Sequence, residues 1–249
     1  DMHSWVKLWK HHGAQKEADT ITFVAAQNND KFIRHYGSKA SSEWMFPKIL
    51  ETLDRSPRLY EDTYCFMEAG DWIVYQLTGE VKKSSTLAGY KAFWNAHDGY
   101  PSPEFFKAVN SRFEHVVTEK IHFENAIYSP GFCAGGLTSL MAKKTGLKEG
   151  THISVSSIDA HVGVPAVGIK EEGTLLLVMG TSLCHLLISK REVLLDGISG
   201  VVKDGILPGF YGYEAGQAAV GDIYEWFVTN MVNYEYMNEA LRRNINIYD

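Results

Sequence analysis

The sequence predicts an α/β protein in which a mostly helical first half is followed by a strand-rich second half. Ser-Pro pairs and a stop glycine mark helices in the first half. An unbroken apolar run at 174–179 has the length of a strand. A glycine-bounded, charged stretch at 168–173 lies where the pattern changes and reads as a hinge. We therefore expect two domains, 1–169 and 170–249.

Start and stop signals place the helices of the first half. Ser56-Pro57 and Ser102-Pro103 each offer a capping hydroxyl followed by proline at the first helical position. The stretch 71–78 reads as the end of a further helix, which Gly79 stops.

Strand patterns begin after Gly150. Residues 152–156 alternate apolar and polar, as a half-buried strand does. The run 174–179 is typical of a central strand covered on both faces, and 183–189 resumes a strand after a small turn. Together they predict a β-hairpin. A second turn is expected at Asp204-Gly205. An amphipathic helix is indicated by apolar residues at helical spacing: Ala219, Ile223, Trp226, Phe227 and Met231.

Composition narrows the class of protein. The 249 residues are 45% hydrophobic and 22% charged, which is ordinary for a folded domain. The net charge is -6 and no Lys or Arg block stands out, which argues against nucleic acid or an anionic membrane as partner. The three cysteines are far apart and form no C-x-x-C pair, so reduced thiols in a cytoplasmic protein fit best.

Asp159 is the first candidate catalytic residue. It follows the strand at 152–156, and open α/β sheets usually place their sites at the carboxyl ends of strands. A carboxylate there can act as a general base for an attacking hydroxyl. The competing interpretation is an N-cap, with Ala160 as the first helical residue. His161 adds an Asp-x-His pair, which is a weak metal signal without further ligands, so we expect a packed histidine.

Two further glycine-containing stretches could hold ligands. At 179–182 a glycine and two hydroxyls can approach a phosphate, although the same residues also make a tight turn. Neither a Walker loop nor a dinucleotide fingerprint is present. At 209–217 aromatic rings accompany Glu214, a combination that suits a sugar pocket or a Gly-rich loop with buried tyrosines. Lys91 lies among aromatics and could bind a sugar oxygen or extend into water.

Read in order, these pieces resemble the FGGY family of carbohydrate kinases, and within it the kinases of L-ribulose. The resemblance covers nearly the whole chain. The stretch at 205–217 is the most specific to the ribulose kinases, whereas the Asp and Gly-Thr-Ser elements are general to the family. The stretches that carry it are 8–12, 41–48, 68–79, 88–91, 159–162, 179–182 and 205–217.

The resemblance implies two actin-like, ribonuclease-H-like domains with sugar and nucleotide in the cleft between them. It implies transfer of the γ-phosphoryl group of Mg²⁺-ATP to ribulose, giving ribulose 5-phosphate, as in L-arabinose catabolism. Asp159 then matches the catalytic base, and Lys91 and Glu214 match positions that contact the ketopentose. Residues Gly180, Thr181 and Ser182 match the second phosphate loop, which binds ATP.

This chain departs from the family pattern at both ends. It has no opening strand with an Asp-x-Gly-Thr-like loop, and no adenine-binding segment before Asp249. We therefore expect an incomplete sugar kinase fold, made of the latter part of the sugar-binding domain and the start of the nucleotide-binding domain. Alone it should be inactive. The expected partners are a sugar and ATP, with no nucleic acid and no membrane, and a homodimer stays open.

Other functions remain open from the sequence. The first is a kinase for xylulose, another pentulose or a polyol. The second is a non-catalytic sugar-binding module, which would keep Lys91 and Glu214 without needing Asp159. The third is a metal-dependent hydrolase built on Asp159 and His161, which no further ligand nearby supports.

Overall fold

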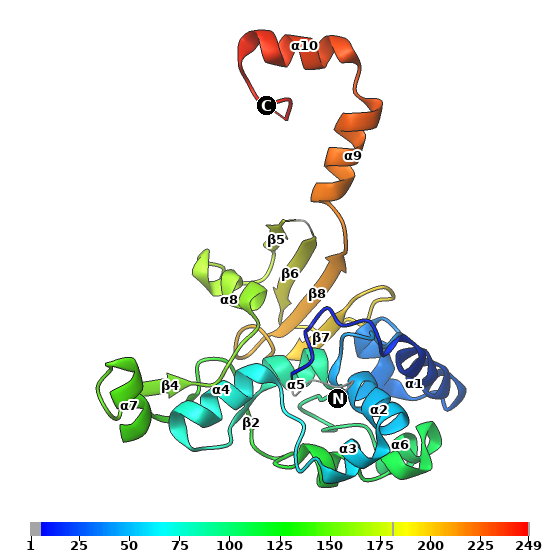
Figure 1. Cartoon of the computed structure of the whole chain (residues 1–249), viewed down its shortest axis with the longest axis vertical. Helices are drawn as coiled ribbons and strands as arrows, with labels where there is room; N and C mark the ends of the chain where they lie inside the picture. Colours follow the sequence, from blue (N-terminus) through cyan, green and yellow to red (C-terminus); the bar gives the residue numbers. More distant parts are fainter. Residues whose placement is uncertain (1–5, 181, 249) are drawn as a thin grey trace.

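The computed structural model describes residues 6–180 and 182–248 (Figure 1). The first part is mainly helical, as predicted, and carries two short two-stranded sheets, parallel β1–β2 and antiparallel β3–β4. Its elements are α1 (Gln15–Gln27), η1 (Lys31–Tyr36), α2 (Met45–Arg55), α3 (Pro57–Asp62), α4 (Ala69–Thr78), β1 (Lys83–Ser84), α5 (Ser85–Lys91), α6 (Pro103–Val109), η2 (Ser111–Phe113), η3 (Val117–Ile121), β2 (Ile127–Tyr128), β3 (Cys133–Gly136), α7 (Ser139–Thr145), β4 (His152–Ser154) and α8 (Asp159–Ala166).

The predicted helix signals act as expected at two of three places. The Ser102 hydroxyl accepts a hydrogen bond from the Phe105 amide and caps α6. Gly79 ends α4 with φ of 75°, a left-handed conformation that glycine adopts without strain. Ser56 precedes α3, but its hydroxyl makes no capping bond there.

An aromatic core holds the helical part together. Its rings come from η1, α2, α6 and the segment after α5, and Phe46 stacks on Phe93 with centroids 5.7 Å apart. The Tyr36 hydroxyl donates to the Gly89 carbonyl at 2.5 Å, which ties η1 to α5. Because α5 is anchored from this side, its C-terminal residues are held in place relative to the core.

The second part is one antiparallel sheet in the order β5-β6-β8-β7 (Figure 1). Met179 pairs with Leu183, so the predicted hairpin is confirmed, as is the turn at Asp204-Gly205 between β7 and β8. Helix α8 packs on one face of β5 and β6. The elements are β5 (Leu175–Met179), β6 (Leu183–Ser189), β7 (Gly200–Lys203), β8 (Tyr211–Gln217), α9 (Gly221–Met231) and α10 (Tyr234–Arg243).

One expectation about burial is wrong. Strand β5 was expected to be central and covered on both faces, yet it forms the sheet edge and most of its residues are exposed. The helix expected from the apolar spacing is present as α9, but none of its residues is buried. Figure 1 shows α9 and α10 extending away from the sheet, so no described element covers their apolar side chains. The pattern of apolar residues predicts that a strand or helix forms, but it does not predict which other elements cover it.

Tyr90 joins α5 to the sheet. Its side chain is 1% exposed and packs with Val202 and Leu186. Three glycines make room for the ring, because a Cβ on any of them would come within 2.4–2.7 Å of a Tyr90 ring or hydroxyl atom. These glycines are Gly200, Gly205 and Gly212. We call this space the glycine slot.

We predict that Gly212→Ala destabilises the protein by about 1–3 kcal/mol, the usual cost of overpacking a filled site. The new Cβ would lie 2.5 Å from the Tyr90 hydroxyl oxygen. Gly163→Ala in α8 is the matched control, since its Cβ would meet only Leu176 at an ordinary 3.5 Å. Denaturant midpoints of both variants measure the difference. Equal midpoints would show that the slot is not tightly filled.

Candidate functional site

The candidate residues Asp159, Lys91 and Glu214 all act electrostatically on Cys184, on β6. Glu214 on β8 pairs with Leu186 on β6, and Cys184 lies two residues before Leu186 on β6. The side chains of Glu214 and Cys184 therefore point to the same face of the sheet. Burial raises the pKa of the Cys184 thiol, Glu214 and Asp159 raise it further, and Lys91 lowers it. All three charged groups are therefore within electrostatic range of one thiol.

Asp159 is the first residue of α8 and is exposed. Its Oδ1 accepts a hydrogen bond from the Ala160 amide at 2.8 Å. The cap position itself is Ile158, so the interpretation of Asp159 as N-cap is wrong by one residue, although the carboxylate still bonds to a first-turn amide. Because no other hydrogen bond to Asp159 is found among the described residues, Oδ2 remains available to a hydroxyl.

Lys91 is the last residue of α5 and is half-buried. Its ammonium makes no ion pair within residues 6–180 and 182–248. Its charge helps to lower the pKa of Glu214, and it opposes the rise that burial causes in the pKa of Glu68. Lys91, next to Tyr90, thus gives the site a positive charge that is not held in an ion pair by a described carboxylate.

Glu214 is held by His161. The His161 Nε2 atom lies 2.8 Å from Glu214 Oε2, and the two side chains are 1% and 17% exposed. Burial raises the pKa of Glu214, but the hydrogen bond from His161 and the charge of Lys91 outweigh it, so the pKa is lowered overall. His161 is the packed histidine that the sequence favoured. No three-ligand metal cluster is found in the described part of the chain.

The Gly-Thr-Ser turn connects β5 to β6. The Gly180 amide donates to the Ser182 carbonyl at 2.8 Å, so that amide is already engaged. A Cβ on Gly180 would meet nothing nearer than 3.7 Å, and the exposed Ser182 hydroxyl has no bond to the described residues. The turn is open enough for a phosphate to approach. Thr181, the third predicted residue, lies outside the described residues.

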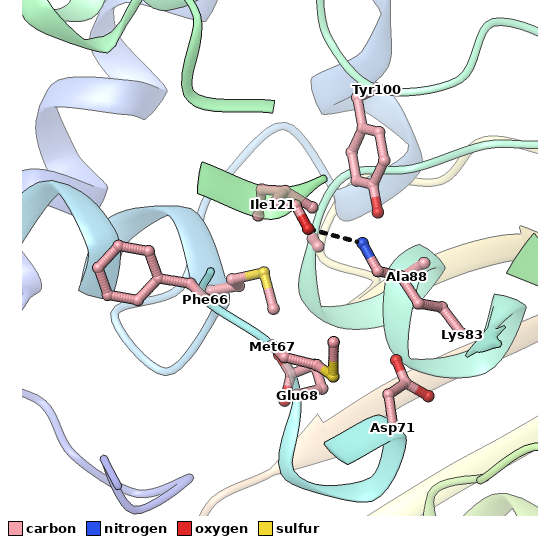
Figure 2. Close-up of a pocket in the computed structure, with 10 residues that line it drawn as sticks. Phe66, Met67, Glu68, Asp71, Lys83, Ala88, Tyr100 and Ile121 are labelled. Carbon is pink, nitrogen blue, oxygen red and sulfur yellow. Dashed lines mark hydrogen bonds between the residues drawn. The ribbon is translucent and has the colours of Figure 1, made fainter. Parts of the chain in front are cut away.

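A cavity that the sequence did not predict lies beside α5, with a volume of about 10 Å³, enough for one water (Figure 2). Glu68, the N-cap residue of α4, and Asp71 in its first turn line the cavity, and Lys83 donates to the Ile121 carbonyl at 3.0 Å. Burial and the neighbouring Asp71 raise the pKa of Glu68 to about 7, against the pull of Lys91 and Lys48. The spacing of Glu68 and Asp71, three residues apart at a helix start, was the only signal for this pair.

Asp71 is held more firmly than Glu68. It accepts hydrogen bonds from the Ser84 amide at 3.0 Å and the Ser156 hydroxyl at 2.7 Å. Burial raises its pKa to about 6, and these hydrogen bonds limit the rise. The two serines come from β1 and from the segment before α8, so Asp71 links three parts of the helical region.

The fold is that of sugar kinases. Xylulose kinase from Rhodospirillum rubrum superposes with a TM-score of 0.73 at 17% identity, covering 94% of this chain and 45% of that one. Plasmodium falciparum glycerol kinase with ADP gives 0.68 at 16%, covering 93% and 46%. These neighbours have the actin-like, ribonuclease-H-like fold of FGGY sugar kinases, so the predicted fold class is confirmed for the part that this chain covers.

Sequence narrows this class further. Residues 175–248 match the FGGY family of carbohydrate kinases, C-terminal domain. The chain is 48% identical over 247 residues to the ribulokinase of Bacillus licheniformis, and 48% identical over 246 residues to that of Halalkalibacterium halodurans. These matches cover 99% of this chain but only 44% and 43% of those proteins. The chain is thus a partial, ribulokinase-like chain of the FGGY carbohydrate kinases, as the sequence predicted. Among the described helices none is long and apolar enough to cross a membrane.

Glu68 makes stability depend on pH. Its folded pKa of about 7 lies above the usual 4.5, so the folded state binds more protons between these values and loses stability as pH rises through 7. We predict that Glu68→Gln raises the free energy of unfolding at pH 8 by about 1–3 kcal/mol and flattens its pH dependence. Asp71, whose pKa is raised to about 6, should still make the free energy of unfolding fall slightly as pH rises below 6.

Urea unfolding between pH 5 and pH 8 measures this effect. Glu149→Gln, on an exposed residue, serves as the control. A wild-type stability that is flat across this range, or an unchanged slope in Glu68→Gln, would contradict the assignment.

Proposed function

We propose that the protein containing this chain is an ATP-dependent kinase that phosphorylates ribulose to ribulose 5-phosphate. The observation that carries the proposal is that Asp159 on α8, Lys91 on α5 and Glu214 on β8 all act electrostatically on one thiol, Cys184 on β6. The chain's similarity to proteins named ribulokinase supports ribulose as the sugar. The chain spans less than half the length of those relatives, and the activity is proposed for the whole protein.

Asp159 is the general base in this proposal. The terminal hydroxyl of the sugar would donate its proton to the free Oδ2 as its oxygen forms a bond to the γ-phosphorus. The bond from that phosphorus to the bridging oxygen of ADP breaks, and the proton later passes to solvent. The exposure of Asp159 at the first turn of α8 supports this role, because the carboxylate can reach a ligand without any movement of the helix.

Lys91 and Glu214 would bind the sugar. The ammonium of Lys91 makes no ion pair with another described residue and can donate to a carbonyl or hydroxyl oxygen of the ketose. Glu214 uses Oε2 for His161, which leaves Oε1 to accept a hydrogen bond from a sugar hydroxyl. A donor beside an acceptor suits a neutral polyhydroxy substrate.

ATP would bind at the turn between β5 and β6. The open Gly180 and the free Ser182 hydroxyl fit a phosphate, and Thr181 completes the predicted set. In this proposal Mg²⁺ arrives on the phosphates of ATP and balances their charge. Closure of domains 1–169 and 170–249 about the hinge would exclude water. We further propose a cytoplasmic enzyme whose partners are the sugar and ATP, and expect the isolated chain to be inactive.

An ATP-dependent phosphorylation assay on the full-length natural protein tests the proposal, with L-ribulose, D-ribulose, D-xylulose and glycerol as substrates. We expect turnover of ribulose, and a loss in Asp159→Asn of about 10²- to 10⁴-fold in kcat, the usual contribution of a general base. Lys91→Met should raise KM for the sugar instead.

Glu104→Gln is the matched control, because it also removes an exposed first-turn carboxylate, from α6. Activity on xylulose alone would move the substrate to another ketopentose. A wild-type protein that binds sugar without phosphorylating it would replace the kinase with a sugar-binding module.

A further inference from the structure

We infer that His161 is a positioning residue that fixes the Glu214 carboxylate in the orientation that binds sugar. The inference rests on the proposed function in one respect, that Glu214 contacts the substrate. It extends that function to a residue that touches no substrate itself. Three observations carry it: the hydrogen bond between the two side chains, the buried Nδ1 of His161 that has no partner among the described residues, and the packing of the His161 ring.

The hydrogen bond has only one possible direction. The pKa of Glu214 is lowered, mainly because the bond from His161 and the charge of Lys91 outweigh its burial, so the carboxylate is ionised and can only accept. His161 Nε2, 2.8 Å away, must therefore carry the proton and donate it. A bond to an ionised acceptor is stronger than a neutral one, which suits a contact that has to restrict a rotamer.

The other ring nitrogen determines the tautomer. His161 Nδ1 is buried and has no hydrogen-bond partner among the described residues. A proton there would leave a buried N–H without an acceptor, which costs more than an unfilled lone pair. The geometry thus favours a neutral ring with its proton on Nε2.

Packing keeps the ring in place. The Tyr90 ring lies 4.4 Å from the His161 ring, centroid to centroid, at an interplanar angle of 59°. Tyr90 is itself confined by the glycine slot, so it cannot move aside to let the imidazole rotate. His161 is also two residues from Asp159 on α8. One helix therefore carries the proposed base and fixes the orientation of a sugar-binding carboxylate 53 residues further along the chain.

Loss of the donor has a definite consequence. Without His161 Nε2 the half-buried Glu214 carboxylate loses the hydrogen-bond donor found for it among the described residues, so it can rotate and its pKa rises. Sugar binding should weaken, and weaken further as pH falls. The chemistry at Asp159 should change less, because no bond between His161 and Asp159 exists in the described structure.

The test compares His161→Leu, which has no donor, with His161→Gln, whose amide can still donate to Oε2. Both are made in the full-length natural protein and assayed with ribulose and ATP. We expect His161→Leu to raise KM for ribulose about ten-fold to 100-fold with a smaller change in kcat, and to make KM more sensitive to low pH. We expect His161→Gln to restore most of the KM. His152→Leu, on the exposed surface of β4, is the control and should change neither constant.

The tautomer gives a readout that is independent of activity. Nitrogen-15 NMR of wild type should show a neutral His161 with its proton on Nε2 at pH 7, and a shifted signal in Glu214→Gln. This measurement needs no substitution at His161, so it stands even if those variants fail to fold.

Each outcome has a distinct meaning. A wild-type protein without kinase activity but with the expected tautomer contradicts the proposed function and keeps the His161–Glu214 pair. An active wild type with the proton on Nδ1 overturns the inference. An unchanged KM in His161→Leu, or equal defects in the Leu and Gln variants, overturns it as well.

Discussion

The packing of Tyr90 into the glycine slot is the contact on which the candidate site depends. It fixes the end of α5 against β7 and β8, and Lys91 follows directly after it. On the other side of α5, the bond from Tyr36 to Gly89 connects the helix to the aromatic core. Helix α5 is therefore packed tightly between the aromatic core and the sheet, which η1 and α8 also contact. A larger residue at any of the three glycines would disturb this packing.

The same junction concentrates charge in a partly buried place. Lys91 acts on Glu68 in the small cavity and on Glu214 on the sheet, and it is fixed to neither by an ion pair among the described residues. Glu68 is left with a pKa near 7, whereas Glu214 is kept ionised by His161. Buried charged groups that lack ion-pair or hydrogen-bond partners lower stability. Such groups are common at functional sites, where a bound ligand supplies the missing interaction.

Local features of the fold could be predicted from the sequence, because they depend on neighbours in the chain. The cap at Ser102, the stop at Gly79 and the hairpin at 174–189 are of this kind. The exposure of β5 and α9 could not, because an apolar pattern shows which face seeks burial but not what covers it.

The candidate site also has features that could be predicted from the sequence and features that could not. Asp159, Lys91 and Glu214 were singled out from residue type and family resemblance, and their functional roles stay predictions. The structure adds that they lie within electrostatic range of one thiol. The bond of His161 to Glu214 and the pairing of Glu68 with Asp71 in a cavity depend on three-dimensional packing. No sequence spacing shows that two residues 53 positions apart share a hydrogen bond.

The most direct test of the account is whether a ketose protects Cys184, the thiol around which the three charged groups lie. Alkylation rates of each cysteine in the full-length natural protein can be followed by mass spectrometry, with and without saturating ribulose. We predict that ribulose slows modification of Cys184 several-fold and leaves the exposed Cys133 unchanged. Equal rates at Cys184 with and without a sugar that the protein phosphorylates would place the sugar elsewhere and contradict the account.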